Sequence, residues 1–468
     1  MPNKLLNRNF SELVFLFLTV LISRIPFLFA GFGSEEDSWL LPLTAKNIAL
    51  SGQYELSRAP GHPLQEIIYS CMWNSVPFYY NLLSAVMSVI AVLFFALSLK
   101  QLGFKHYLFA AYAFAFTPIV FISSTYTIDY MPAMAFVMVS FYFLLRNYFL
   151  LSGVFLGLAI GFRITSGLML IPFCMLLLPF SKERLKGILF LSIGTTIIGL
   201  LTYLPVIKTY GFSFFTFSDQ FPYPNLAKVF YKATFGVFGT IGVGTIIFYK
   251  LKIVIGKFGL KEKMLSSGMP VDLFRACLIV LVIYIISYLR LPQKSAYLIP
   301  IIPFIILMFG YFLSSGQFKL FCLLITMSSF LFSMNLTDSL RGAAHSPLSM
   351  KFTLAGQETF IDPLTGPAFS DHSKRLHKIN FTKKVLEKTK AQQAKTVLIC
   401  GWWYNELRVE MWNYEKNKNI EFVFYIDKKT MEKYISEGYD IYYLPEQDLY
   451  NDQFSQMNYT DSVAKPYM

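Results

Sequence analysis

Charged residues are scarce in this sequence. They make up 15% of its 468 residues, whereas soluble domains carry about 25%. Cysteine is also sparse, and the five cysteines are so scattered that no pair has the spacing of metal ligands. This pattern argues against a disulfide framework or a cysteine metal site. Residues 1–30 lack a small-residue cleavage site after their apolar run, so we expect the first helix to stay as a membrane anchor.

Apolar residues are abundant instead, and they are unevenly distributed. Hydrophobic residues make up 55% and aromatic residues 18% of the chain. Before about residue 335, apolar runs of 16–22 residues recur, and each is about long enough to cross a hydrocarbon core of ~30 Å. The sequence therefore predicts an α-helical polytopic membrane protein, with about eleven transmembrane helices in residues 1–335 and a small water-soluble α/β domain in residues 336–468. The predicted spans are residues 12–30, 77–99, 107–124, 128–145, 148–162, 164–180, 188–207, 229–249, 275–289, 296–314 and 319–335.

The net charge of +13 belongs to the membrane part. Residues 1–335 hold 24 basic and 11 acidic residues, and residues 336–468 hold 17 of each. If the spans alternate, most Lys and Arg of the short loops fall on one side, which the positive-inside rule assigns to the cytoplasm. The N-terminus is then cytoplasmic, and the first outer loop (residues 31–76) and the C-terminal domain are exoplasmic. No basic cluster on a soluble face indicates binding of nucleic acid.

The tail has the pattern of alternating strands and helices. Residues 395–401, 420–426 and 441–444 are apolar runs typical of strands. Residues 428–437 predict a helix, with Asp427 as its N-terminal cap and Gly438 at its end. No phosphate-binding glycine-rich loop or nucleophile elbow marks this region as catalytic.

Acidic residues gather on the predicted outer side. Seven of the eleven acids before residue 336 lie there, and topology does not explain this bias because Asp and Glu contribute little to membrane orientation. The bias hints at chemistry on the outer face. These acids are Glu35, Glu36, Asp37, Glu55, Glu66, Asp129 and Asp219.

Asp37 and Glu36 are the first candidates for that chemistry. Asp37 ends the run Glu35-Glu36-Asp37, just after the first span. A helix cap alone would explain Asp37. Three consecutive acids repel one another, however, which favours a group that binds a cation or accepts a proton, because such neighbours raise the pKa of a carboxylate.

Asp129 stands at the outer start of another span. A carboxylate at membrane depth costs a few kcal/mol unless it faces a cavity or a partner. Asp129 is therefore a functional candidate, with a helix cap before Pro132 as the alternative. Arg163 lies between two short spans and needs an anion, which is either a lipid phosphate or the carboxylate of Asp129 or Glu66.

Four further residues of the outer side are candidates for binding an anion or a substrate. Arg58 and His62 flank a Pro-Gly turn, where loop structure and contacts with lipid headgroups are the alternative explanation. Arg290 and Lys294 lie outside against the positive-inside trend. A local anion explains such charges, and so does snorkelling to the headgroups.

These segments together resemble the GT-C superfamily of membrane glycosyltransferases, which includes the protein O-mannosyltransferases and the bacterial aminoarabinose transferase. The resemblance covers about residues 10–310 and depends on the order of several short motifs on one side of the membrane. The motifs are Glu36-Asp37, Arg58-Ala-Pro-Gly-His-Pro-Leu64 followed by Asn81-Leu-Leu-Ser84, Ile128-Asp-Tyr-Met-Pro132, Gly157-Leu-Ala-Ile-Gly-Phe-Arg-Ile-Thr-Ser166 and Lys294-Ser-Ala-Tyr-Leu-Ile-Pro300.

The resemblance implies an enzyme of a bacterial plasma membrane. Its donor is a polyprenyl-phosphate sugar, and its acceptor is a hydroxyl of a lipid, glycan or protein on the outer side. Asp37 would be the general base of an inverting transfer, with Glu36 and Asp129 orienting the acceptor or tuning Asp37. Some members need a divalent cation, although no His-rich site here calls for one. The substrate-binding residues would be Arg58, His62, Arg163, Arg290, Lys294 and Tyr297.

Other functions compete with this interpretation. A transporter or lipid flippase would carry out no covalent chemistry and predicts internal repeats with broken helices, of which we find no clear example. An O-antigen polymerase or ligase typically relies on a late, Arg-rich outer loop, whereas the early loop is the rich one here. A structural or receptor role would leave the outward acids and Arg163 unexplained.

Overall fold

The computed structural model describes residues 2–177, 181–212, 223–255, 268–335, 346–354, 357–414, 417–444 and 464–467. The structural statements that follow refer to these residues. Asp219 and parts of the predicted C-terminal domain lie outside them.

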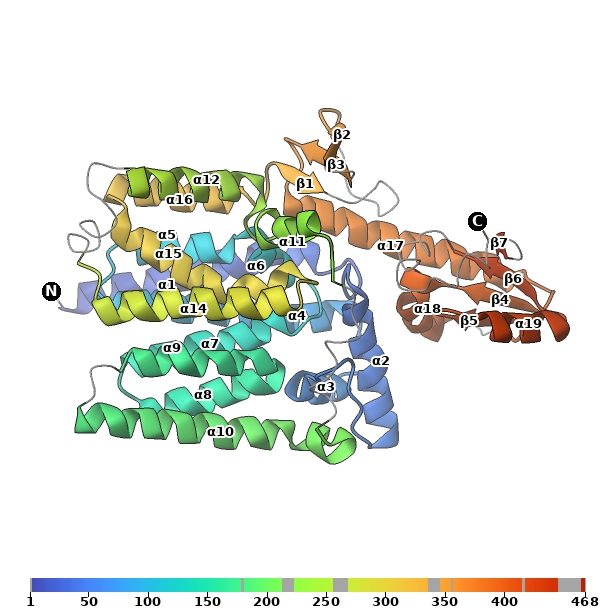
Figure 1. The fold of residues 1–468 in the computed structure, drawn as a ribbon, viewed down its shortest axis with the longest axis horizontal. Helices are drawn as coiled ribbons and strands as arrows, with labels where there is room; N and C mark the ends of the chain where they lie inside the picture. The colour runs from blue at the N-terminus through green and yellow to red at the C-terminus, as the bar shows by residue number, and fades with distance from the viewer. Residues whose placement is uncertain are drawn as a thin grey trace.

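Most of the chain forms a bundle of helices, from which a smaller part projects at one end (Figure 1). Six helices in the described part are long and apolar enough to cross a membrane by length and composition. They cover Phe10–Phe27, Pro77–Gln101, Lys182–Tyr210, Phe235–Val254, Val271–Arg290 and Ser295–Phe312. The chain is thus a helical membrane protein, as its composition predicts. Shorter apolar helices at Tyr130–Leu145, Phe149–Phe162, Ile164–Met175 and Ser315–Met327 fall within other predicted spans or overlap them.

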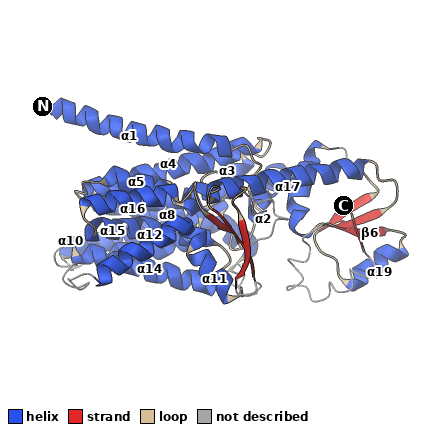
Figure 2. Ribbon diagram, turned by 90° about the horizontal axis from the view of Figure 1, so that it is seen from above, coloured by secondary structure: helices blue, strands red, loops and turns tan. Residues whose placement is uncertain are grey.

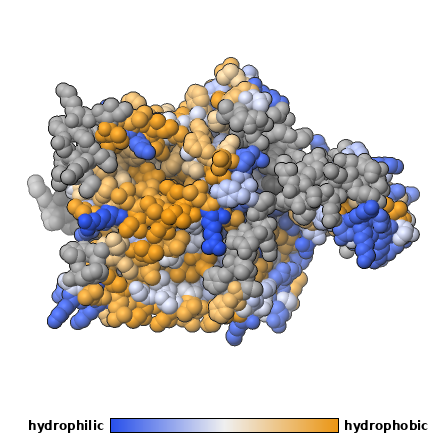
Figure 3. Space-filling model, viewed as in Figure 1, coloured by the Kyte–Doolittle hydropathy of each residue, from blue (hydrophilic) through white to orange (hydrophobic). Residues whose placement is uncertain are grey.

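The surface agrees with this class. In Figure 3 apolar side chains cover much of the visible face of the bundle, and hydrophilic ones gather toward its ends and on the projecting part.

The two termini lie at opposite ends of the molecule (Figure 1). The helices of the bundle are α1 (Pro2–Arg24), η1 (Ile25–Phe27), α4 (Pro77–Gln101), α5 (Tyr107–Ala115), α6 (Pro118–Ser123), α7 (Tyr130–Leu145), α8 (Phe149–Phe162), η2 (Ile164–Met169), α9 (Leu170–Met175), α10 (Lys182–Tyr210), α11 (Leu226–Ala233), α12 (Phe235–Ile255), α14 (Val271–Arg290), η4 (Ser295–Ile301), α15 (Ile302–Phe312) and α16 (Ser315–Met327).

Several predicted spans are not continuous helices, and the spans at 107–124 and 319–335 are two of them. The span at 107–124 is divided into α5 and α6, because Pro118 begins α6 and cannot continue the hydrogen-bond ladder of a preceding helix. The span at 319–335 ends at Met327, and Ser333–Asn335 form strand β1. Pairing of β1 with a later strand uses the backbone groups that a longer helix would need.

Helices α8 and α10 approach each other closely along a row of glycines. A Cβ atom added to Gly153 would lie 2.4 Å from the carbonyl oxygen of Leu191, and one added to Gly157 would lie 2.9 Å from the backbone nitrogen of Gly199. Gly161 is equally restricted by Leu64 and by α10. Small residues four positions apart let membrane helices pack backbone against backbone. The row therefore fixes α8, and the end of α8 carries Arg163.

Two short helices lie across the end of the bundle from which the C-terminal part projects: α2 (Glu36–Ser51) and α3 (Pro63–Ser70) (Figure 1). The buried Asn81 of α4 holds the chain that leads into α2. Its amide donates to the carbonyls of Leu28 at 2.8 Å and Gly31 at 2.7 Å, and it accepts from Thr127 at 2.8 Å. The segment before α2 is thereby fixed beside the segment before α7.

The projecting part contains a sheet of parallel strands in the order β5-β4-β6-β7. Its predicted strands and helix form close to the expected residues. Asp427 caps α19 by accepting from the backbone of Thr430 at 2.8 Å, and Gly438 follows the helix with a φ of +80°. The elements after the bundle are β1 (Ser333–Asn335), β2 (Met350–Leu354), β3 (Gln357–Asp362), α17 (Pro367–Lys390), β4 (Thr396–Ile399), η6 (Gly401–Trp403), α18 (Tyr404–Glu410), η7 (Met411–Asn413), β5 (Ile420–Val423), α19 (Lys428–Ser436), β6 (Asp440–Tyr443) and β7 (Lys465–Pro466).

Helix α17 leads from the bundle to this sheet (Figure 2) and is anchored by a buried arginine. Arg375 is 1% exposed and donates to the carbonyls of Phe27 at 3.1 Å and Thr125 at 3.0 Å. Its Nε lies 3.0 Å from the carboxylate of Asp371, which accepts from Ser34 at 2.9 Å. The C-terminal part is therefore bonded to the same two segments that Asn81 holds. Strands β1, β3 and β2 form a separate antiparallel sheet, so pairing crosses the predicted boundary at residue 335.

The glycine row predicts that an added methyl group lowers stability at the contact between α8 and α10 but not at an uncrowded glycine. Gly153→Ala places a Cβ against the backbone of α10, so we expect the free energy of unfolding to fall by about 1–3 kcal/mol. The control is Gly244→Ala in α12, where a Cβ would meet nothing within 4 Å and the helix gains about 1 kcal/mol. Thermal unfolding of both variants in detergent measures this difference in stability. Equal stability of the two variants would contradict the close packing of α8 against α10.

Candidate functional site

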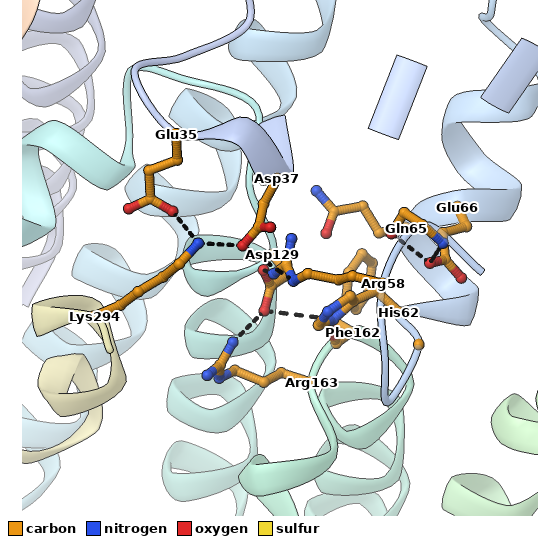
Figure 4. A network of polar contacts seen from close by, with 12 residues as sticks. Glu35, Asp37, Arg58, His62, Gln65, Glu66, Asp129, Phe162, Arg163 and Lys294 are labelled. Carbon is orange, nitrogen blue, oxygen red and sulfur yellow. Dashed lines mark hydrogen bonds and ion pairs between the residues drawn. The ribbon is translucent and has the colours of Figure 1, made fainter. Parts of the chain in front are cut away.

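The candidate residues stand at helix ends that meet at one end of the bundle. Asp129 is the residue before α7, and Arg163 follows α8. Arg290 is the last residue of α14, and Lys294 precedes η4. Asp37 lies in the first turn of α2. The short connections between these helices bring residues from distant stretches of sequence into one polar network (Figure 4).

Asp129 lies at the centre of the network and is fully buried. Nη2 of Arg58 donates to one carboxylate oxygen, and Nη1 of Arg163 lies 2.6 Å from the other. Nδ1 of His62 is 3.5 Å from that second oxygen. A buried carboxylate is stable only when cations and hydrogen bonds compensate its lost hydration. Arg163 thus pairs with Asp129, which is the internal partner that the sequence left open.

Asp37 belongs to the same network through two cations. Nζ of Lys294 donates to Asp37 and also to Glu35 at 2.6 Å. Nε of Arg58 lies 3.4 Å from Asp37, so Arg58 stands between Asp37 and Asp129. Burial raises the pKa of Asp37, but Arg58 and Lys294 outweigh burial and lower it to about 2. Asp37 is therefore a carboxylate at neutral pH.

His62 is held as a neutral ring with one free nitrogen. A carbonyl oxygen only accepts, so Nδ1 must donate to the carbonyl of Phe162, 2.7 Å away. Burial lowers the pKa of His62 to about 4, and the nearby Arg58 and Arg163 add to this effect. Nε2 is buried and has no hydrogen-bond partner among the described residues. It therefore offers a lone pair to a ligand that carries a hydroxyl or amide proton.

A cavity of about 240 Å³ opens beside the network, and we call it the arginine cavity. Three arginines line it, and no described acid does. The rest of its lining includes the apolar residues Ile164 and Leu291, and the last turns of the spanning helix α14 contribute Tyr284 and Ser287 as well as Arg290. One cavity therefore combines a cationic end with a face that belongs to a membrane helix. Its lining residues are Arg58, Ala59, Pro60, His62, Arg163, Ile164, Thr165, Tyr284, Ser287, Arg290, Leu291 and Tyr297.

The aromatic residues of the site support the cations. The guanidinium of Arg163 lies 4.7 Å from the ring centre of Tyr297 and 4.7 Å from that of Tyr130. Contacts of this kind attract a cation to the face of an aromatic ring. Tyr297 was a candidate from its motif, but Tyr130 was not, because a tyrosine at the start of an apolar helix carries no distinctive signal.

The structure also places the other acids of the first outer loop that lie near the site. Glu35, which was not among the predicted site residues, meets Lys294, and Glu36 is the first residue of α2. Glu66 does not meet Arg163. Its carboxylate is buried and accepts from the backbone of Ser57 at 2.7 Å and from its hydroxyl at 2.6 Å. It closes the loop that presents Arg58 and His62, and Tyr54 donates to it as well.

Comparisons with known proteins do not assign the chain. No protein family, curated protein or solved structure matches it. Functional assignment therefore depends on the geometry of the site and on the motif resemblance.

A metal site is not prearranged in the described part of the chain. No group of three or more His, Cys, Asp or Glu side chains there is placed to hold a metal ion. Glu35 and Asp37 share the ammonium of Lys294. The charge of these two carboxylates is thus balanced by amino acid side chains.

Removal of the central carboxylate tests the network. Asp129→Asn leaves Arg58 and Arg163 close together with no full counter-charge, so we expect the free energy of unfolding to fall by about 3–5 kcal/mol. The matched control is Asp272→Asn, which breaks a 3.7 Å pair with the exposed Arg275 and costs less than about 1 kcal/mol. Chemical or thermal unfolding measures both, and similar losses would show that Asp129 is no more important than a surface acid.

Acid titration tests the ion pairs of Asp37. Its folded pKa of about 2 lies below the ordinary 3.8, so its stabilisation is complete above about pH 4 and is lost as the pH falls toward 2. Between pH 5 and 2 the wild type should lose about 2 kcal/mol more stability than Asp37→Asn. Unfolding temperatures of both proteins measured across this pH range test the prediction. If the unfolding temperatures of the two proteins fall in parallel, the ion pairs of Asp37 do not contribute this stability.

Proposed function

We propose that the protein is an inverting glycosyltransferase of the GT-C type. It would move a sugar from a polyprenyl-phosphate donor to a hydroxyl of a lipid, glycan or protein acceptor. The observation that carries this proposal is the sharing of Arg58 between Asp37 and the arginine cavity. A site for an anionic leaving group and a carboxylate base are thereby next to each other, as a displacement at an anomeric carbon requires.

The arginine cavity would hold the phosphate of the donor. Arg58, Arg163 and Arg290 line it, and Nη1 of Arg58 is buried without a hydrogen-bond partner among the described residues. Guanidinium groups bind phosphate oxygens with strong charge-assisted hydrogen bonds. The apolar part of the lining, which includes Ile164 and Leu291, would accept the first part of the polyprenyl chain, which reaches the site from the membrane.

Asp37 would accept the proton of the acceptor hydroxyl. As the hydroxyl oxygen bonds to the anomeric carbon, the bond from that carbon to the phosphate oxygen breaks, and its electron pair leaves with the phosphate. Arg58, Arg163 and Lys294 would stabilise the charge that grows on this leaving group. Attack from the face opposite the phosphate inverts the anomeric centre.

The resting ion pairs suggest that the donor activates the base. A carboxylate with a pKa of about 2 is a weak base, because Arg58 and Lys294 stabilise its charged form. A phosphate that attracts these two cations would weaken their hold on Asp37 and raise its pKa. Asp37 would then be an effective base only when donor is bound.

The proposal also includes the topology and location derived from the sequence. The membrane domain would have about eleven spans, in which pairs of short helices complete some crossings. The N-terminus would be cytoplasmic, and the site and the C-terminal α/β domain would face outward from a bacterial plasma membrane. The short helices around the site and the placement of the termini at opposite ends of the molecule support this arrangement.

Transfer from defined donors tests the assignment. Purified protein is incubated with a panel of radiolabelled polyprenyl-phosphate sugars and candidate acceptors. We expect Asp37→Asn to retain donor binding and to lose transfer by two or more orders of magnitude, as removal of a general base does. The control is Glu55→Gln, an exposed acid in the same loop that accepts from Asn47, and its turnover should stay close to wild type.

Two different results would contradict two different parts of the proposal. Equal turnover by wild type and Asp37→Asn removes Asp37 from the mechanism. If wild type binds the lipid donor but leaves the bond between sugar and phosphate intact with every acceptor, the chain moves or holds lipid without covalent chemistry, and the transporter alternative replaces the transferase.

A further inference from the structure

A second cavity lies next to the proposed base and is separate from the arginine cavity. It has a volume of about 220 Å³ and lies between the start of the first outer loop and α17. We call it the α17 cavity. Its described lining residues are Ser34, Glu35, Asp371, Lys374, His377, Lys378 and Trp403. None of the residues that line the arginine cavity is among them.

The α17 cavity is connected to the site through Glu35. This residue lines the cavity, and its carboxylate lies 2.6 Å from Nζ of Lys294. The same ammonium group donates to Asp37. A ligand in the α17 cavity would therefore contact Glu35, which shares the ammonium of Lys294 with the proposed base.

The walls of the α17 cavity are fixed by buried contacts. Ser34 donates to Asp371 at 2.9 Å, which ties the loop to the helix. Lys378 is 3% exposed and lies 3.3 Å from the buried carboxylate of Glu406. The indole of Trp403 packs against Phe381 with ring centres 4.2 Å apart. The cavity is thus part of the folded structure and not a gap between mobile loops.

The chemistry of the lining selects a class of ligand. Six of the seven described residues are polar and the seventh is a tryptophan, so the described lining offers no Leu, Ile or Val side chain to an acyl chain. Two acids and two lysines balance each other, which gives no net attraction for an anion. Sugar hydroxyls both donate and accept hydrogen bonds, as this mixture of groups requires. The volume is below the ~300–1,000 Å³ of pockets for drug-sized ligands, which suits a single sugar ring.

We propose that the α17 cavity binds a neutral sugar unit of the acceptor, which makes the acceptor a glycan. This assignment of the acceptor rests on the proposed transferase function, whereas the binding of a sugar does not. The bound ring would lie against Glu35, and a neighbouring part of the same glycan would present its hydroxyl to Asp37, while the donor phosphate occupies the arginine cavity.

Direct binding without donor tests the sugar site. Saturation-transfer NMR of the full-length protein in nanodiscs is recorded with neutral methyl hexopyranosides, a methyl glucuronide and a sugar phosphate. Neutral glycosides should bind best, and Lys374→Ala and His377→Ala should each weaken that binding by about tenfold, the effect of one lost polar contact. His377 is exposed, so its loss should not affect folding. Lys384→Ala is the control, an exposed lysine of α17 outside the cavity.

Steady-state kinetics then place the bound sugar in the reaction. Lys374→Ala and His377→Ala should raise the KM for a glycan acceptor about tenfold and leave kcat and the KM for the donor unchanged. No sugar binding by wild type, or stronger binding of the anionic sugars, would overturn the proposal. If neutral sugars bind but no donor is turned over, the sugar site stands and the transferase assignment fails.

Discussion

The polar network depends on one guanidinium. Arg58 reaches Asp129 with one nitrogen and Asp37 with another, and it comes from a loop that the buried Glu66 closes. Asp129 is fully buried, so its charge is stable only while Arg58 and Arg163 remain in place. Because the two carboxylates share this arginine, an anion that attracts Arg58 must change the electrostatic environment of both.

The positions of the charges follow from the helices that carry them. Asp129 stands at the N-terminus of α7, where the helix dipole favours a negative charge, and Arg163 and Arg290 stand at the C-termini of α8 and α14, where it favours positive charge. Lys294 is the exception, since it precedes a helical segment. Its stability depends on Glu35 and Asp37, which is a physical reason for the consecutive acids in the sequence.

Several features of this molecule follow from sequence alone. Long apolar runs predict the membrane helices, because length and hydropathy suffice for that inference. The strands and the capped helix of the tail are also predictable, because the signals for each lie within a short stretch of sequence. It is also predictable that Asp129 and Arg163 each need a partner, since a charge at membrane depth does, but the sequence left a lipid phosphate, Asp129 and Glu66 open as the anion that meets Arg163. The order of the motifs also places the candidate residues on one side of the bundle.

The remaining features depend on contacts between distant residues. Glu35 meets Lys294 across 259 positions, and neighbouring residues at a helix start point in different directions, so the sequence does not indicate which of three acids faces a cation. The pairing of Arg58 with Asp129 is equally hard to predict, because the loop that carries Arg58 is long enough to allow many orientations. The break between α5 and α6 depends on Pro118 in a run whose hydropathy gives no sign of it.

Close contact between α8 and α10 limits which side chains fit on the face of α8 that meets α10. Leucine or valine at Gly153 or Gly157 would suit the lipid environment and would increase the hydropathy of α8. Either residue would nevertheless force the two backbones apart and shift Arg163 with the end of its helix. Membrane insertion and the placement of Arg163 therefore favour different side chains at these positions, and only the smallest one fits the packing.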